Sequence, residues 1–144
     1  MATAPLVVRW MERLLAAEPT PLTLAQYVAL RAIEQGAVGV TELARRAGVS
    51  GPAASQLLAG LVDGGLVDRR PQAGDRRRQD LSLTTEGQRV LSSAEAAISG
   101  ELGRLLAGVP RPEIDALARA LPVLEASLTG TAPPRRPPPP PPPR

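Results

Sequence analysis

Apolar residues recur every three or four positions in six stretches of the chain, and this spacing predicts six helices. In the first stretch, Leu6, Trp10 and Leu14 lie four residues apart, so one helix face is apolar. The expected helices cover residues 5–17, 24–35, 42–47, 51–63, 86–107 and 112–129. Residues 66–70 form an expected short strand, and residues 79–83 alternate polar and apolar as a half-buried strand does.

Side chains that accept hydrogen bonds from helical N–H groups mark where several of these helices begin. We expect N-caps at Thr23, Thr41, Ser50 and Thr85. Gln26 and Gln88 stand three residues after Thr23 and Thr85, so each of these two pairs matches a capping box. Glycines at 36, 48 and 64 follow predicted helix ends, where a residue without a side chain suits the turn.

The two expected strands flank a turn and carry much positive charge. Residues 71–74 supply turn chemistry, with Pro71 fixing φ and Gly74 permitting a positive φ. Five arginines lie within ten residues: Arg69, Arg70, Arg76, Arg77 and Arg78. A hairpin tip lies far from any core, so packing does not explain these arginines. A solvated turn that protects a sheet edge is the alternative explanation.

The order of these elements favours DNA binding over a solvated turn. The short helices at 42–47 and 51–63 are joined through Ala47-Gly48-Val49-Ser50, a short turn containing glycine that is typical of a helix-turn-helix. A charged hairpin directly after it makes a winged helix, whose second helix fits the major groove. The expected fold is therefore mainly α with a small β-hairpin wing: a winged helix-turn-helix plus N- and C-terminal dimerisation helices.

Composition excludes several classes of function. The 144-residue chain has no Cys, no His and no Lys, which argues against thiol chemistry, histidine catalysis, the common zinc sites and phosphate loops ending in Gly-Lys. We therefore expect neither an enzyme nor a cofactor or metal site. No apolar run is long enough to span a membrane and no signal peptide is apparent, so a cytoplasmic protein is expected.

Charge is concentrated rather than spread evenly. Residues 1–130 contain fourteen arginines and fourteen acids, so this part is neutral. Residues 69–78 hold five of those arginines and only one acid, Asp75, so the remainder is acidic. A focused basic site on an acidic surface is the pattern expected of a protein that orients itself on a polyanion.

The two ends of the chain predict a homodimer, because their apolar stripes exceed what a small winged helix can cover. The expected interface residues are Leu6, Trp10, Leu14, Ile98, Leu102, Leu117, Leu121 and Leu124. Pro122 lies within the last stripe, and we expect it to kink the helix between Ala118 and Leu121. Residues 131–144 contain nine prolines and three arginines, which predicts an extended polyproline II tail.

The segments TELARRAGVS, LVDGGLVDRRP and DRRRQDLSLTTEG resemble the MarR family of bacterial winged-helix regulators. The resemblance covers residues 22–130 and is tightest over 41–87. It implies a homodimeric DNA-binding regulator, usually a repressor, that a small and often aromatic ligand releases from DNA. Together with the apolar stripes and the composition of the tail, we expect an N-terminal dimerisation helix (1–21), the winged helix (22–84), C-terminal dimerisation helices (85–130) and a disordered tail (131–144).

The resemblance also assigns roles to residues of this chain. Arg77 matches the wing arginine that enters the minor groove, and Asp75 matches the acid that holds it. Arg76 and Arg78 are expected to face phosphate, and Arg69 and Arg70 to lie at the wing base. The exposed early turns of the recognition helix are expected to present Ser50, Pro52, Ala53, Ser55 and Gln56. Residues 51–63 depart from typical members because they contain no Arg or Lys, which favours reading of DNA by the wing and by DNA shape.

Two questions stay open at the level of sequence. Trp10 and Tyr27, with Arg31 nearby, are candidates for an aromatic-ligand pocket, and the alternative is that they are ordinary core residues. The partner is expected to be double-stranded DNA with a pseudo-palindromic operator. The alternative is a winged-helix module that docks on another protein, which a recognition helix without cations and a proline-rich tail would also fit.

Overall fold

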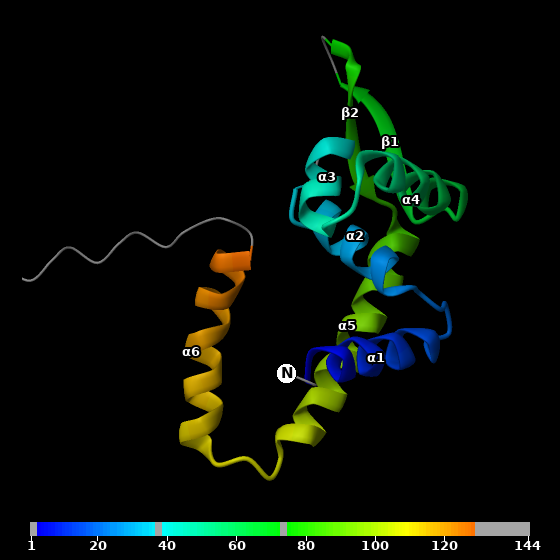
Figure 1. Ribbon diagram of the computed structural model, residues 1–144. Helices are drawn as coiled ribbons and strands as arrows, with labels where there is room; N and C mark the ends of the chain where they lie inside the picture. The colour runs from blue at the N-terminus through cyan, green and yellow to red at the C-terminus, as the bar shows by residue number, and fades with distance from the viewer. Residues whose placement is uncertain (1–2, 37–38, 73–74, 129–144) are drawn as a thin grey trace, which may run out of the picture. The chain divides into compact units, whose positions relative to one another are not determined.

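The computed structural model describes residues 3–36, 39–72 and 75–128, with the backbone alone described at 71–72, 75–79, 125, 127 and 128. Within these residues the chain forms six helices and one two-stranded sheet (Figure 1). The elements are α1 (Thr3–Ala16), α2 (Leu24–Glu34), α3 (Val40–Ala47), α4 (Gly51–Asp63), β1 (Val67–Gln72), β2 (Asp75–Leu83), α5 (Thr85–Leu106) and α6 (Arg111–Leu128). They fall into two compact units, residues 1–104 and 105–144. The expected fold class, mainly helical with a small hairpin, is confirmed.

Two of the predicted caps start α2 and α4. Thr23 and Gln26 form the predicted capping box, in which the Thr23 hydroxyl accepts from the N–H of Gln26 at 3.1 Å. The Gln26 Oε1 accepts from the N–H of Thr23 at 2.9 Å. Ser50 caps α4 by accepting from the N–H of Ala53 at 3.3 Å. Gly48 ends α3 in the left-handed conformation at φ 65°, a backbone state that favours glycine.

The predicted start of α3 was wrong. Thr41 does not cap it, because the helix already begins at Val40 and the extended residue before it is Gly39. Gly39 makes no side-chain cap, but its carbonyl accepts from the N–H of Leu43 at 2.9 Å. Val40 packs against the core cluster, so tertiary packing of the first helical residue outweighs the capping preference of Thr41.

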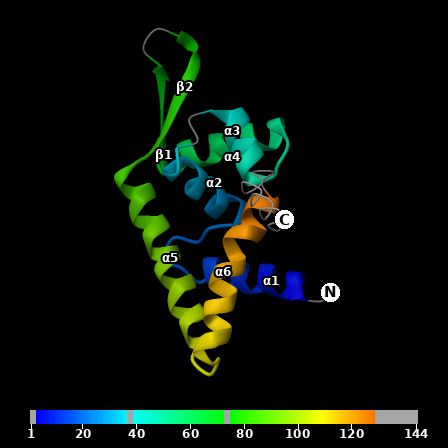
Figure 2. The same cartoon turned by 90° about the vertical axis from the view of Figure 1, so that its left-hand side faces the viewer.

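The hairpin is longer than predicted. β1 and β2 pair antiparallel from Val67↔Leu83 to Pro71↔Gln79, with an irregularity between Pro71 and Gln72. The prediction placed Pro71 and Gln72 in the turn, whereas both belong to β1. Residues 73–74 of the predicted turn lie outside the described residues. The hairpin projects away from α2, α3 and α4 (Figures 1 and 2).

The core of the first unit is built from aliphatic side chains of α1, α2, α3, α4, the hairpin base and the first half of α5. Its fully buried larger members are Leu15, Leu30, Leu43, Leu58, Leu61, Leu91 and Val67. Val67 and Leu81 anchor the two strands in it, while Arg69 and Arg70 further along β1 are exposed. The core thus fixes the base of the hairpin relative to α4.

The start of α5 differs from the prediction by one residue. Thr84, rather than Thr85, supplies the cap, because its hydroxyl accepts from the N–H of Gly87 at 2.9 Å. The same hydroxyl donates to the carbonyl of Gly65 at 2.7 Å. Thr85 is the first helical residue, so the predicted capping box of Thr85 and Gln88 was wrong.

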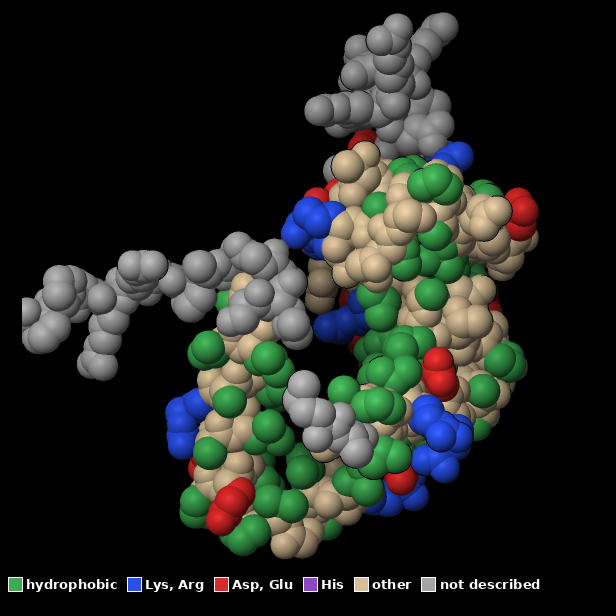
Figure 3. Space-filling model, viewed as in Figure 1, with side chains coloured by type: hydrophobic (Ala, Val, Ile, Leu, Met, Phe, Trp, Pro, Cys, Tyr) green, Lys and Arg blue, Asp and Glu red, His purple; other side chains and the backbone are tan. Residues whose placement is uncertain are grey.

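The second unit contains α6, which continues through Pro122 as a helix. Its predicted apolar residues Leu117, Leu121 and Leu124 are 46–55% exposed. Hydrophobic side chains follow the exposed surface of this helix in Figure 3. The kink expected before Pro122 stays a prediction. The proline-rich tail at 131–144 lies outside the described residues.

The structure also bears on two predicted absences. No helix in the described part of the chain is long and apolar enough to cross a membrane. The residues described there contain no cluster of three or more His, Cys, Asp or Glu side chains suited to a metal ion.

Candidate nucleic-acid interface

Helix α4 presents the predicted recognition residues on its outer face. Ala54, Leu58 and Leu61 are fully buried and fix the rotation of the helix about its axis. The opposite side carries the predicted set, all exposed: Ser50, Pro52, Ala53, Ser55 and Gln56. Gln56 has the donor and acceptor needed to bind adenine in the major groove, and Ser55 has a hydroxyl. This face can read base edges, but it carries no positive charge.

The hairpin places its described cations in solvent. Arg69 and Arg70 follow the buried Val67 on β1 and are both exposed. Arg70 lies 3.6 Å from the carboxylate of Asp68, an open contact between two well exposed side chains. Exposed pairs of this kind contribute little to stability, so Arg70 stays available to an external anion.

The remaining wing residues are known by their backbone. Asp75, Arg76, Arg77 and Arg78 lie on β2, and their side chains are outside the described part of the structure. Asp75 pairs with Gln72 at the far end of the hairpin, and Gln79 pairs with Pro71. The sequence-predicted wing cluster therefore lies on the outer part of the hairpin, and the roles of its side chains stay predictions.

A second charged cluster on α3 was not among the predicted site residues. The carboxylate of Glu42 accepts from Arg45 Nε at 3.0 Å, from Arg45 Nη2 at 2.8 Å and from Arg46 Nε at 2.5 Å. Hydrogen bonds from Arg45 and then Arg46 lower the pKa of Glu42 from 4.5 to about 2, so Glu42 is ionised at neutral pH. The sequence signal was present: two adjacent arginines in the last turn before the helix-turn-helix turn.

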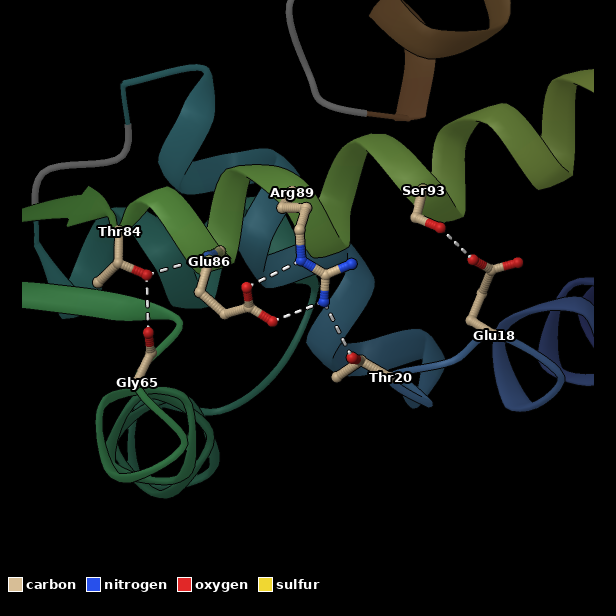
Figure 4. A network of polar contacts seen from close by, with 8 residues as sticks. Glu18, Thr20, Gly65, Thr84, Glu86, Arg89 and Ser93 are labelled. Atoms are coloured by element: carbon tan, nitrogen blue, oxygen red, sulfur yellow. Dashed lines mark hydrogen bonds and ion pairs between the residues drawn. The ribbon is translucent and has the colours of Figure 1, made fainter.

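Polar contacts fasten the hairpin base and the α1–α2 connection to α5 (Figure 4). Thr84 joins Gly65 to the first turn of α5. One turn further on, Arg89 pairs with Glu86 at 2.6 Å and reaches the Thr20 hydroxyl at 3.4 Å. The Ser93 hydroxyl donates to Glu18 at 2.5 Å. The Thr84 contacts position the base of the wing relative to α5, and the contacts of Thr20 and Glu18 attach the α1–α2 connection to the same helix.

The predicted ligand residues lie on α1 and α2. Arg31 forms an ion pair with Glu95 of α5, and this hydrogen bond raises the pKa of Arg31. Tyr27 packs partly buried against the core, and burial raises the pKa of its hydroxyl. Trp10 has its indole Nε1 buried without a hydrogen-bond partner among the described residues. The Tyr27 and Arg31 environments therefore fit structural roles.

A shallow hollow of about 430 Å³ lies along α1. Its lining residues are Leu6, Arg9, Glu12, Arg13 and Ala16, a set that includes none of the three predicted ligand residues.

The predicted dimer residues divide by exposure. Leu6 is 63% exposed, and Leu102 is 44% exposed near the end of α5. Trp10, Leu14 and Ile98 are partly buried within the chain, Ile98 against the core cluster. The exposed members form apolar surface that this chain leaves in contact with solvent.

Comparison with known proteins gives the same architecture. The model of the MarR family matches residues 20–78. The crystal structure of RV1404 from Mycobacterium tuberculosis is 24% identical, covers 93% of this chain and 90% of its own, and gives a TM-score of 0.76. CouR from Rhodococcus jostii RHA1, bound to p-coumaroyl-CoA, is 25% identical with 85% of each chain covered and a TM-score of 0.68. The transcriptional regulator BldR from Sulfolobus solfataricus is 21% identical, covers 87% of this chain and 88% of its own, and gives a TM-score of 0.72.

Proposed function

We propose that the chain is a MarR-family winged-helix transcription regulator that binds double-stranded DNA, and the match of the family model to residues 20–78 supports this. The observation that carries the proposal is the joint exposure of Ser55 and Gln56 on α4 and of Arg69 and Arg70 on β1. Base-reading groups and phosphate-binding groups are the two components that a sequence-specific DNA interface needs.

In the proposed complex, α4 lies in a major groove and the hairpin lies against the neighbouring minor groove. Arg77 on the outer hairpin enters the minor groove, where a narrow groove concentrates negative potential, and Asp75 holds it in place. Arg76 and Arg78 face phosphate. Because α4 carries no cation, the wing and the shape of the DNA contribute more to recognition than α4 does.

A homodimer forms the second part of the proposal. Burial of exposed Leu6, Leu102 and the α6 residues Leu117, Leu121 and Leu124 against a second copy would remove these apolar surfaces from water. A two-fold dimer places two recognition helices on one side, so the operator is pseudo-palindromic with half-sites about 34–36 Å apart.

The regulator is proposed to act as a repressor that a small aromatic ligand releases. The aromatic ligand class follows the family resemblance, and the solved structure of CouR with p-coumaroyl-CoA shows that such a fold can hold an aromatic acyl group. The candidate ligand residues are Trp10, Tyr27 and Arg31, and an aromatic acid would have to compete with Glu95 for the guanidinium of Arg31. A thermal-shift screen of aromatic acids tests this part, and an unchanged melting temperature across the panel would contradict it.

A protein-docking module is the second candidate, favoured by the cation-free exposed face of α4. A gel-shift with the DNA upstream of the protein's own gene, at moderate salt, separates the two. We expect a shift that excess unrelated duplex does not abolish. Absence of any shift, even in dilute buffer, would overturn the DNA-binding proposal and leave protein docking.

A further inference from the structure

We propose that Arg45, in the last turn of α3, contacts a DNA phosphate beside the groove that α4 enters, and that Glu42 weakens this contact by competing for the guanidinium. The inference rests on the DNA binding proposed above. It adds Arg45 as a phosphate contact and Glu42 as a group that lowers DNA affinity. Neither residue is among the DNA-binding residues expected from the sequence.

The position of Arg45 follows from the helix-turn-helix. Only Gly48, Val49 and Ser50 separate the end of α3 from the first residue of α4. The last turn of α3 is therefore close to the N-terminal end of the recognition helix. In this motif the first helix crosses the DNA backbone while the second enters the groove. The side chain of Arg45 is 57% exposed, so an external anion can reach it.

Helix α4 creates the need for such a contact. Asp63 is its only charged residue, so the helix itself offers phosphate no cation. Phosphate contacts from neighbouring elements fix the register of a recognition helix on DNA. On the N-terminal side of α4, Arg45 and Arg46 are the nearest cations along the chain.

The two arginines differ in how they are held. Arg46 is 30% exposed, and its Nη1 donates to the carbonyl of Gln35 at 3.0 Å, which ties α3 to the end of α2. Arg45 bonds to Glu42 through Nε and Nη2. Its Nη1 has no hydrogen-bond partner within the described part of the chain, and a guanidinium has five N–H donors. Arg45 is therefore the one able to bind an external anion.

Glu42 opposes that binding. A single carboxylate neutralises half of the charge of the two arginines and accepts both Arg45 bonds. A phosphate at Arg45 would lie close to this ionised group and be repelled by it. In Glu42→Gln an uncharged amide replaces the carboxylate beside the bound phosphate. Removing this repulsion is expected to raise DNA affinity by about threefold.

The test compares two matched pairs. Arg45→Ala, Glu42→Gln and the double variant probe α3. Arg104→Ala and Glu101→Gln are the controls, because these residues form an i,i+3 pair at 2.5 Å near the far end of α5, with side chains 78% and 28% exposed. Glu101 lies about 24 Å along α5 from its first residue, at about 1.5 Å per residue. Each variant changes net charge by the same amount as its counterpart.

Binding is measured by fluorescence anisotropy on the protein's upstream DNA and on an unrelated duplex of equal length, across a series of salt concentrations. Arg45→Ala should lower the affinity for both duplexes by a similar factor. It should also reduce the slope of the logarithm of the binding constant against the logarithm of salt concentration by about one unit per subunit bound. Glu42→Gln should tighten binding, and this gain should disappear in the double variant. The control variants should bind as the unchanged protein does.

Each contrary result has a separate meaning. If Arg45→Ala binds as tightly as Arg104→Ala, the phosphate contact is wrong. If Glu42→Gln tightens binding no more than Glu101→Gln, the proposed effect of Glu42 is wrong. Far-UV circular dichroism tests whether each variant folds. If Arg45→Ala does not fold, Arg45→Gln takes its place. If the unchanged protein binds neither duplex, DNA binding itself is overturned together with this inference.

Discussion

Gly87 shows how one residue joins the wing to the long helix. A Cβ atom added at Gly87 would lie 2.0 Å from the carbonyl oxygen of Leu66 and 2.9 Å from its carbon. Both are backbone atoms, so a change of side-chain rotamer cannot relieve the clash. Leu66 also accepts through this carbonyl from the N–H of Thr84 at 3.1 Å. The requirement at Gly87 is therefore space for the backbone of Leu66.

Gly87→Ala should destabilise the fold by about 1–3 kcal/mol, because the strand base must separate from α5 to admit a methyl group. Gly100→Ala is the matched control in the same helix, since a Cβ there meets nothing within 4 Å. That change should stabilise the protein by up to about 1 kcal/mol, as alanine is the better helix former. Urea unfolding followed by circular dichroism measures both. Equal effects of the two substitutions would show that the contact with Leu66 is not tight.

Single residues also mark the limit of prediction from sequence. Thr84 and Thr85 are adjacent and chemically identical, and the capping-box pattern selects Thr85. Thr84 is the cap because its hydroxyl also reaches the carbonyl of Gly65, nineteen residues away in the chain. A tertiary hydrogen bond of this kind has no signature in local sequence.

At the scale of elements, apolar spacing was sufficient to predict the six helices and two strands that the described residues form. The periodicity reflects the core directly, as Leu58 and Leu61 on α4 illustrate. Boundaries were less predictable where packing or pairing competes with local preference. Pro71 suits a turn, yet it lies opposite Gln79 in the sheet, because cross-strand pairing extends the hairpin beyond it.

The candidate site was predictable in part for a related reason. Exposed polar residues of α4 follow from the helical period, so Ser55 and Gln56 were identified. Arg45 and Arg46 both donate to the carboxylate of Glu42. A sequence alone does not show whether such charges pair with each other or face a ligand. The hydrogen bond from Arg46 to Gln35 is what separates the two arginines.

The wing and the recognition helix make separable contributions, and their ranking can be measured. Arg77→Ala should weaken binding to the operator by about tenfold or more, since a good base-directed contact contributes about 1–3 kcal/mol. Gln56→Ala should cost less, because α4 brings no cation to hold Gln56 against the bases. Gel-shift titrations of both variants on the same duplex give the comparison. Equal losses, or a larger loss for Gln56→Ala, would contradict a recognition mode led by the wing.

At the scale of the whole molecule, the chain leaves apolar surface exposed at both ends. Leu6 on α1 and Leu121 on α6 are more than half exposed. Each nevertheless belongs to an apolar stripe of its own helix, with the spacing that is typical of a buried face. A protein that kept such stripes in water would lose the favourable free energy of their burial. The proposed dimer would bury this surface, and it would place two recognition helices on one operator.

Leu121→Asp should therefore convert the protein to a monomer, because a carboxylate in an apolar interface must be desolvated without a partner. Val123→Asp is the matched control: Val123 is 55% exposed on the same helix but lies two residues away, on a different side at about 100° per residue. Size-exclusion chromatography with light scattering gives the mass of each variant. Loss of the dimer should also weaken operator binding, since one half-site contact is lost. If Leu121→Asp stays dimeric while Val123→Asp dissociates, the interface uses the other side of α6, and if neither dissociates, α6 lies outside the interface.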